Sequence, residues 1–200
     1  MSDLLRKLAA CVLAFALPFS AQAASEPQAV VEAVTKQLMG IAREHGGSGG
    51  NQEVYFSEVE KILGDVVDFR FIARNVMGKD SFNKATPAQR QKFTEVFRGG
   101  LVKSYAKGIA GYVNSEIKVV GASVNPNDPS RAVVRQEVSH EGAVHQLSYS
   151  MRLQDEQWQV INVILNGVNL GQSFSSQFTA AMRKESGDLD KVINNWLAES

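Results

Sequence analysis

Cysteine is nearly absent from this chain of 200 residues, which contains only Cys11. No intramolecular disulfide can form from a single thiol, and a zinc site would have to do without the thiolate ligands that structural zinc prefers. Cys11 ends a Leu-Ala-Ala-Cys sequence similar to a lipoprotein cleavage box, but the box precedes the apolar run that it should follow. We therefore expect no lipid anchor, no metal and no cofactor.

Catalytic motifs are also missing. The chain has no phosphate-binding loop and no H-E-x-x-H helix, and its one G-x-S-x-G match, at residues 46–50, is a glycine loop that follows a predicted helix and not a strand-to-helix elbow. Of its three histidines, His45 borders a glycine loop, His140 lies at a predicted turn, and only His145 falls on an apolar strand face. Such a lone histidine is more often a core residue than a catalyst. We expect a protein that is not an enzyme, with a general base at His145 as the alternative.

An excess of positive charge is absent, because 21 Lys and Arg side chains balance 21 Asp and Glu side chains. Generic binding to nucleic acid requires a strong basic field, which this composition does not supply. Attachment to anionic membranes by bulk charge is disfavoured for the same reason. We expect no nucleic-acid partner.

One long apolar run is present, and it lies at the start of the chain. Leu8 to Phe19 follows the basic pair Arg6 and Lys7, and Ala21 and Ala23 form the A-x-A pattern read by signal peptidase. The run is shorter than the roughly 20 apolar residues needed to span a bilayer. Residues 1–23 are therefore predicted to be a secretory signal peptide, and residues 24–200 to form one domain that works outside the cytoplasm.

The first half of the mature chain has the apolar periodicity of α-helices. Thr86, Pro87 and Gln89 form the best start signal, an N-cap with a capping box. Gly99 and Gly100 interrupt that helix and indicate either close packing or a bend beside a ligand. The predicted helices cover residues 30–41, 52–63, 66–77 with an end at Gly78, and 86–108, and two more near the C-terminus cover 172–184 and 188–198.

Four strands are predicted between these groups of helices, at 116–124, 131–139, 143–153 and 157–165. Short turns favour an antiparallel meander. In the last strand, plain alternation places Trp158, Val160 and Ile164 on one face and Ile161, Val163 and Leu165 on the other, so both faces should be covered. The predicted fold class is α+β, a twisted antiparallel sheet of about four strands with N-terminal and C-terminal helices packed on it, enclosing an apolar pocket.

Two apolar stripes are candidates for the pocket, and both could equally be ordinary core. One repeats every four residues along the fourth helix, and the other follows one face of the third strand. The predicted ligand-binding residues are Phe69, Ile72, Val76, Phe93, Phe97, Leu101, Tyr105, Leu147, Tyr149, Met151, Trp158 and Val160. Arg70 and Arg74, one helical turn apart, are either salt-bridge partners or a rim that contacts a lipid head group.

Several of these segments together resemble a known family in order and spacing. They are 69–78 (FRFIARNVMG), 85–90 (ATPAQR), 158–170 (WQVINVILNGVNL), 177–178 (QF) and 187–189 (GDL), with Phe93, Phe97 and Tyr105 between them. The set is similar to the MlaC, or toluene-tolerance auxiliary, family of periplasmic phospholipid-binding proteins. It departs from the family at residues 173–178, where Ser-Phe-Ser replaces the usual Asn-Tyr-Arg.

The resemblance implies a monomeric periplasmic carrier without a cofactor. Such a protein holds phospholipid acyl chains in an apolar pocket and shuttles lipid between an inner-membrane ABC transporter complex and an outer-membrane lipoprotein or porin complex. This function would maintain the lipid asymmetry of the outer membrane. The changed segment leaves open a carrier of another apolar ligand.

Two hypotheses from other classes stay open. A pocket enzyme would use His145 as a base with Tyr105 or Tyr149 as a proton donor, and it needs these groups close together in the cavity. An interaction or chaperone module would have a filled core and no small ligand.

Overall fold

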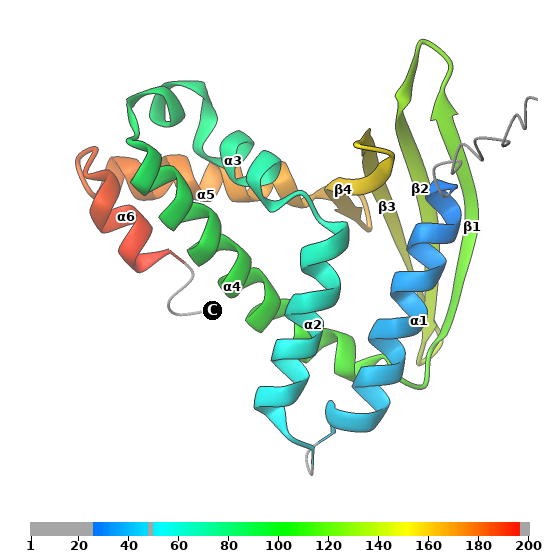
Figure 1. Cartoon of the computed structure of the whole chain (residues 1–200). Helices are drawn as coiled ribbons and strands as arrows, with labels where there is room; N and C mark the ends of the chain where they lie inside the picture. Colours follow the sequence, from blue (N-terminus) through cyan, green and yellow to red (C-terminus); the bar gives the residue numbers. More distant parts are fainter. Residues whose placement is uncertain (1–25, 48–49, 197–200) are drawn as a thin grey trace, which may run out of the picture.

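The computed structural model describes residues 26–47 and 50–196, so the predicted signal peptide lies outside the described residues. Within the described part, six helices and a five-stranded sheet follow one another in the order helices, strands, helices (Figure 1). The predicted α+β class is confirmed, and so is the antiparallel meander with strand order β1-β2-β3-β4-β5.

The first four helices lie at the predicted positions, and all but the third end close to the predicted residue. They are α1 (Pro27–His45), α2 (Gln52–Val66), α3 (Phe69–Lys84) and α4 (Pro87–Gly111). Thr86 and Gln89 form the predicted capping box at the start of α4. Gly78 does not end α3 as predicted. It adopts a φ of 71°, which kinks the chain, and helical structure continues to Lys84.

The sheet consists of β1 (Glu116–Asn125), β2 (Asp128–His140), β3 (Ala143–Gln154), β4 (Gln157–Leu165) and the two-residue β5 (Val168–Asn169). Two helices follow, α5 (Leu170–Lys184) and α6 (Leu189–Asn195). The prediction of four strands missed β5. Its turn, Asn166-Gly167, has φ values of 48° and 83°, and Asn-Gly is a strong signal for this mirror-image turn.

A β-bulge in β4 decides which side chains face the helices. Met151 pairs with Val160 and Ser150 pairs with Asn162, so Ile161 is an extra residue without a partner. The extra residue reverses the alternation beyond it. Val163, opposite Tyr149, and Leu165 therefore lie on the same face as Val160. The expectation that they face the other way is wrong, because plain alternation cannot anticipate a bulge.

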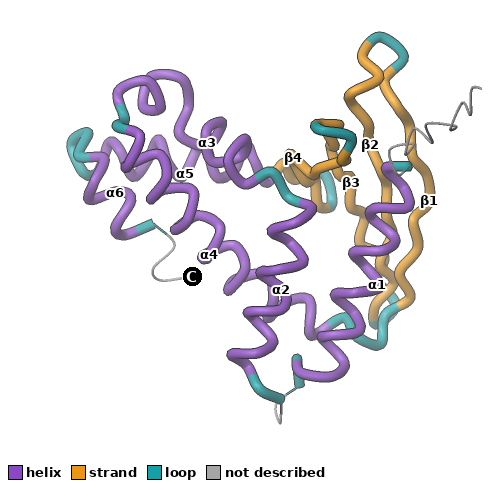
Figure 2. The backbone as a smooth tube through the Cα atoms, in the orientation of Figure 1, coloured by secondary structure: helices purple, strands orange, loops and turns teal. Residues whose placement is uncertain are grey.

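Three apolar clusters form the core. The first joins α3, α4, α5 and α6, and its aromatic centre is Phe93, whose ring lies 5.1 Å from Phe178 and 5.5 Å from Trp196. The second joins the start of α1 to β2, β3 and β4, and the third joins α1, α2 and α4. Figure 2 shows the helices α3 to α6 gathered on one side, with α1 lying against the strands on the other.

The turn between α2 and α3 attaches the helices to the sheet. Val67 forms a parallel bridge with Val160, and the backbone N–H of Asp68 donates to the Val160 carbonyl at 3.0 Å. The Asp68 carboxylate also accepts the Phe71 N–H at the start of α3 and forms an ion pair with Arg152 on β3. The start of α3 is thereby held beside the part of β4 that does not pair with β5.

Candidate apolar ligand cavity

A cavity of about 640 Å³ lies where the three core clusters meet. Phe97 comes from the first cluster, Val31 from the second and Leu38 from the third, and all three line the space. Its walls are α1, the end of α2, the start of α3, the second half of α4, the inner face of β1 to β4 and the start of α5. None of the lining residues is Asp, Glu, Lys or Arg.

Most of the predicted ligand-binding residues lie in this wall. These eight are Phe69, Ile72, Phe97, Leu101, Tyr105, Leu147, Tyr149 and Val160. They come from α3, α4, β3 and β4, and the fold brings them around one space. Their contact with a ligand stays a prediction.

Four predicted residues are packed in the core and do not line the cavity. Val76 and Phe93 are buried among α3 to α6, because both belong to helical turns that lie away from the sheet. Met151 and Trp158 are buried where Val30 and Val31 of α1 pack directly on β3 and β4, which leaves no space. Periodicity identified these side chains as buried, but it does not separate core from cavity wall.

Arg70 and Arg74 lie outside the wall. Both side chains are exposed on α3, and the guanidinium of Arg74 lies 5.3 Å from the ring centre of Phe82. A role for them at the rim of the cavity stays a prediction.

Sequence reasoning missed the contribution of α1 to the wall. Val31, Val34, Leu38 and Met39 line the cavity together with Thr35. The apolar periodicity of α1 predicted a buried face, but it carried no information about the space that this face borders.

The start of α5, where the sequence departs from the family pattern, is also part of the wall. Phe174 is buried, lines the cavity and packs edge-on against Phe97, with ring centroids 5.4 Å apart and planes at 89°. The chain therefore has an apolar ring at this point of the cavity wall.

A polar chain crosses the cavity wall between α1 and the sheet. Nε2 of Gln136 donates to Oγ1 of Thr35 at 2.8 Å, and the Tyr149 hydroxyl donates to Oε1 of Gln136 at 2.8 Å. Burial raises the pKa of the Tyr149 hydroxyl far above its ordinary value of 10.0, so this group stays protonated. Pairing in this way satisfies polar atoms that would otherwise be costly to bury.

Polar side chains also gather at one end of the cavity. Nδ1 of His145 lies 3.1 Å from Nδ2 of Asn166, and the ring of Tyr112 packs edge-on against His145 with centroids 5.8 Å apart. All three line the cavity, and Asn166 is exposed to solvent. No hydrogen bond joins His145 to Tyr105 or Tyr149 among the residues that the structure describes.

Two glycines of α4 behave differently. Gly108 lines the cavity, and a Cβ added to it would meet no atom within 4 Å. A Cβ added to Gly99 would also meet no atom within 4 Å, so close packing does not explain this glycine. Gly99 does not line the cavity. Neither alternative predicted for the Gly99-Gly100 pair therefore accounts for Gly99, and nothing was predicted for Gly108.

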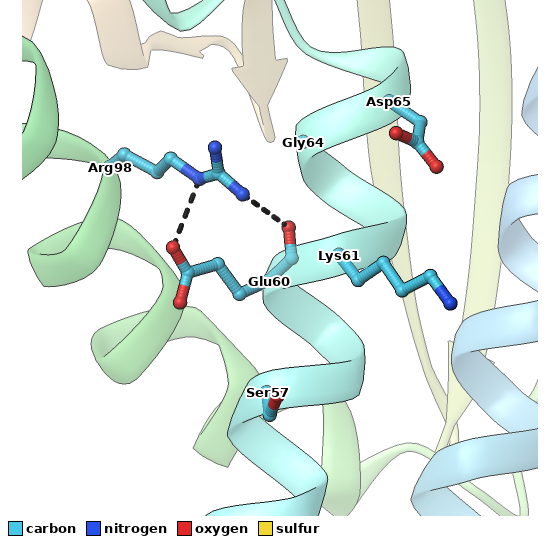
Figure 3. A pocket seen from close by; sticks show the side chains of 6 residues that line it. All are labelled: Ser57, Glu60, Lys61, Gly64, Asp65 and Arg98. Atoms are coloured by element: carbon cyan, nitrogen blue, oxygen red, sulfur yellow. Dashed lines mark hydrogen bonds and ion pairs between the residues drawn. The ribbon is translucent and has the colours of Figure 1, made fainter.

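A shallower polar groove of about 360 Å³ lies between α2 and α4 (Figure 3). Arg98 reaches from α4 to α2, where Nε lies 3.1 Å from Oε1 of Glu60 and Nη2 donates to the Glu60 carbonyl at 3.2 Å. A Cβ at Gly64 would lie 2.6 Å from Nη2, so Gly64 leaves room for the guanidinium. The polar lining of this groove is accounted for by the contact of Arg98 on α4 with Glu60 on α2.

Two further features bear on the class of protein. Within residues 26–47 and 50–196, no three or more His, Cys, Asp or Glu side chains are arranged to hold a metal ion. In the same residues, no helix has the length and hydropathy required to cross a membrane.

These features define an α+β protein with an uncharged, mostly apolar cavity between its helices and one face of its sheet. The family model described as MlaC protein matches residues 32–198. The chain belongs to the MlaC family.

Two similar proteins are consistent with this assignment. The toluene tolerance protein Ttg2D of Pseudomonas putida is 35% identical over 190 residues, which cover 94% of this chain and 87% of that protein. A structure of the phospholipid-binding protein from Ralstonia solanacearum, in complex with a phospholipid, has a TM-score of 0.76 at 24% identity and covers 88% of this chain and 96% of that one. The second likeness shows that the fold is shared.

Proposed function

We propose that this chain is a periplasmic carrier that binds the acyl chains of a phospholipid in the 640 Å³ cavity. It would move lipid between an outer-membrane lipoprotein or porin complex and an inner-membrane ABC transporter complex, and so maintain the lipid asymmetry of the outer membrane. Family membership and the phospholipid bound to the Ralstonia relative support the ligand class.

The observation that carries the proposal is the chemistry of the cavity wall. Exposing one methylene to water costs roughly 0.8 kcal/mol, so a two-chain lipid with about 30 methylenes would cost on the order of 25 kcal/mol to move alone. A cavity that replaces the bilayer needs apolar side chains and must not bury an unpaired charge. The wall meets both requirements, since no Asp, Glu, Lys or Arg lines it.

The alternative of a pocket enzyme is disfavoured by the contacts of His145. A general base needs a free lone pair within reach of the substrate. The Nδ1 atom of His145 is engaged by Asn166, and neither predicted proton donor, Tyr105 or Tyr149, is hydrogen-bonded to the ring. A filled-core interaction module is disfavoured by the cavity itself.

Mass spectrometry of lipids extracted from protein purified gently from the periplasm tests the proposal. We expect phospholipid at about one molecule per chain, and delipidated protein should take lipid up again from phospholipid vesicles. A different apolar molecule in the cavity would still support a carrier, but its cargo would not be phospholipid. Protein that is empty and takes up nothing from vesicles would contradict the proposal and bring the enzyme hypothesis back.

Directional transfer needs a second experiment. Donor vesicles with a fluorescent phospholipid and acceptor vesicles bearing either membrane complex would measure it. The chain has no phosphate-binding loop of its own, so we expect net transfer only with an energised transporter complex. Equal transfer to vesicles without any complex would contradict the proposed partners.

A further inference from the structure

His145 is held in one position at the polar end of the cavity. Its ring lines the cavity, while Nδ1 contacts Asn166 at 3.1 Å and the ring of Tyr112 stands at 87° to it. The residue lies on β3, opposite Val138 of β2. Side chains fixed from two sides in this way keep a constant orientation, so the direction of each hydrogen bond can be worked out.

The backbone sets the orientation of the Asn166 amide. The N–H of Gln146 donates to Oδ1 of Asn166 at 2.8 Å, and the N–H of Asn166 donates to the Gln146 carbonyl, also at 2.8 Å. A backbone N–H can only donate, so the side-chain atom that faces Gln146 must be the oxygen. The amino group of Asn166 therefore faces His145.

This orientation determines the tautomer of His145. An amide NH₂ group can only donate, so Nδ1 of the imidazole must accept with its lone pair. In the neutral ring the proton then lies on Nε2. Within the described residues, no hydrogen-bond partner of Nε2 is found. The cavity wall thus includes an N–H donor that protein atoms leave unused.

The amide of Asn162 can be oriented by the same reasoning, but Asn162 pairs with Ser150, five residues along β3 from His145, and so lies away from the polar end of the cavity. The backbone N–H of Gly171 donates to Oδ1 of Asn162 at 3.1 Å, which leaves the NH₂ group on the other side of the amide. Asn162 lines the cavity, and a Cβ at Gly171 would lie only 2.6 Å from Oδ1, so a side chain there would disturb the contact. The wall around His145 contains no Asp, Glu, Lys or Arg side chain.

We infer that Nε2 of His145 donates a hydrogen bond to an oxygen at the polar end of the bound lipid. The inference rests on the proposed function. An acyl chain has no hydrogen-bond acceptor, whereas a phospholipid has ester carbonyl and phosphate oxygens next to its chains. Such a donor binds these oxygens without a positive charge, so affinity for an anionic phospholipid depends little on salt.

The test compares His145→Phe and Asn166→Asp with the wild type in phospholipid affinity. His145→Phe keeps a flat ring and removes the donor. In Asn166→Asp the carboxylate still accepts from Gln146, and in the neutral ring it draws the imidazole proton to Nδ1 and leaves a lone pair on Nε2, so affinity is measured at a pH at which the ring is neutral. Each variant should lose about threefold to tenfold in affinity, the value of one neutral hydrogen bond. Nitrogen NMR of the imidazole should show the proton on Nε2 in the wild type and on Nδ1 in Asn166→Asp.

His140→Phe is the matched control. This histidine contacts the same Tyr112, with ring centroids 4.8 Å apart, but its Nδ1 is paired with Ser115 and it does not line the cavity. The affinity of the His140→Phe variant for phospholipid should equal that of the wild type. If His145 affected affinity only through the packing of its ring, Asn166→Asp would bind phospholipid as the wild type does, because this variant keeps the His145 ring.

The identity of the oxygen follows from two lipid analogues. A diether phospholipid lacks the ester carbonyls, and a diacylglycerol lacks the phosphate. If the loss caused by His145→Phe persists with the diether and vanishes with diacylglycerol, the oxygen belongs to the phosphate; the reverse result assigns it to an ester. Wild-type affinity in both variants for every lipid would overturn this inference alone, whereas a wild type that binds no phospholipid overturns the proposed function.

Discussion

The hydroxyl of Tyr149 donates a 2.8 Å hydrogen bond to Oε1 of Gln136 inside a mostly apolar cavity wall. Gln136 is 4% exposed and is the one buried polar or charged side chain in the described part of the chain. Its Nε2 donates to Thr35, so three elements, α1, β2 and β3, meet in this contact. The position of α1 over the sheet therefore depends partly on polar groups that water cannot replace.

Replacing Tyr149 by Phe should lower the free energy of unfolding by about 1–3 kcal/mol, because the Gln136 oxygen is left buried without a donor. In a Gln136→Leu background the same change should cost much less, because the unpaired acceptor is gone. Urea unfolding of the four proteins measures the coupling. Tyr105→Phe is the control, since the Tyr105 side chain is 40% exposed. Strict additivity of the two changes would contradict a role for this hydrogen bond.

Stability should fall when the pH rises past 10.0, the ordinary pKa of tyrosine. Burial raises the pKa of both Tyr149 and Tyr55, so above this pH the unfolded chain loses protons that the folded protein keeps. Each group then contributes a slope of at most about 1.4 kcal/mol per pH unit toward unfolding. Tyr149→Phe should make the slope shallower in urea unfolding at alkaline pH, and an unchanged slope would contradict burial of this hydroxyl.

Filling the cavity from α4 should prevent lipid uptake. Gly108→Phe places a ring in open space beside the wall, and removing a helical glycine is favourable by up to about 1 kcal/mol, so the fold should survive. Gly111→Phe is the control, because Gly111 is exposed and has no atom within 4 Å of an added Cβ, as at Gly108, but does not line the cavity. Mass spectrometry should find lipid in the control and little in Gly108→Phe. Equal lipid in both would place the ligand elsewhere.

Asp68 has two separable roles at the start of α3. Asn at this position keeps an oxygen for the Phe71 N–H but loses the charge that pairs with Arg152, whereas Ala loses both. Asp68→Ala should therefore be less stable than Asp68→Asn by about 1 kcal/mol, the value of an N-cap. Thermal unfolding of the two variants checks the order. Equal stabilities would mean that the cap contributes nothing here.

Gly64 and Arg98 should respond differently to substitution. Gly64→Ala displaces the tip of a flexible side chain but gains about 1 kcal/mol of helix propensity, so its net effect should be close to zero. Arg98→Met loses the contacts with Glu60 without that gain and should cost up to about 1 kcal/mol, as expected for a half-exposed pair. Urea unfolding distinguishes them. A large loss in Gly64→Ala would show that the guanidinium cannot move.

The prediction from sequence was most accurate where structure is local. The capping box of Thr86 and Gln89 starts α4, and short turns join the predicted strands into an antiparallel meander. These signals predict structure well because a few neighbouring residues form the hydrogen bonds and turns by themselves. The kink at Gly78 was misjudged as an end, since a glycine with positive φ interrupts a helix without deciding whether the chain resumes it.

The cavity could be predicted only in part. Eight of the predicted residues line it, but periodicity shows burial and not what lies opposite a side chain. Phe93 and Phe97 are one helical turn apart on α4, yet Phe93 packs against Phe178 and Trp196 while Phe97 borders the cavity. Phe93 and Phe97 have different surroundings because α4 runs from the helical core to the cavity. The direction of α4 is set by contacts between segments that are distant in the sequence.

By itself the sequence determined the α+β class, the meander, most helix boundaries and the lack of a recognised catalytic motif, because these depend on periodicity, turn residues and composition. The tertiary structure decided the rest. The bulge at Ile161 turned Val163 and Leu165 toward the helices, and hydrogen bonds between distant segments gave His145 its orientation. An unfilled space between helices and sheet arises only when three separate cores pack together, so the cavity is a property of their assembly.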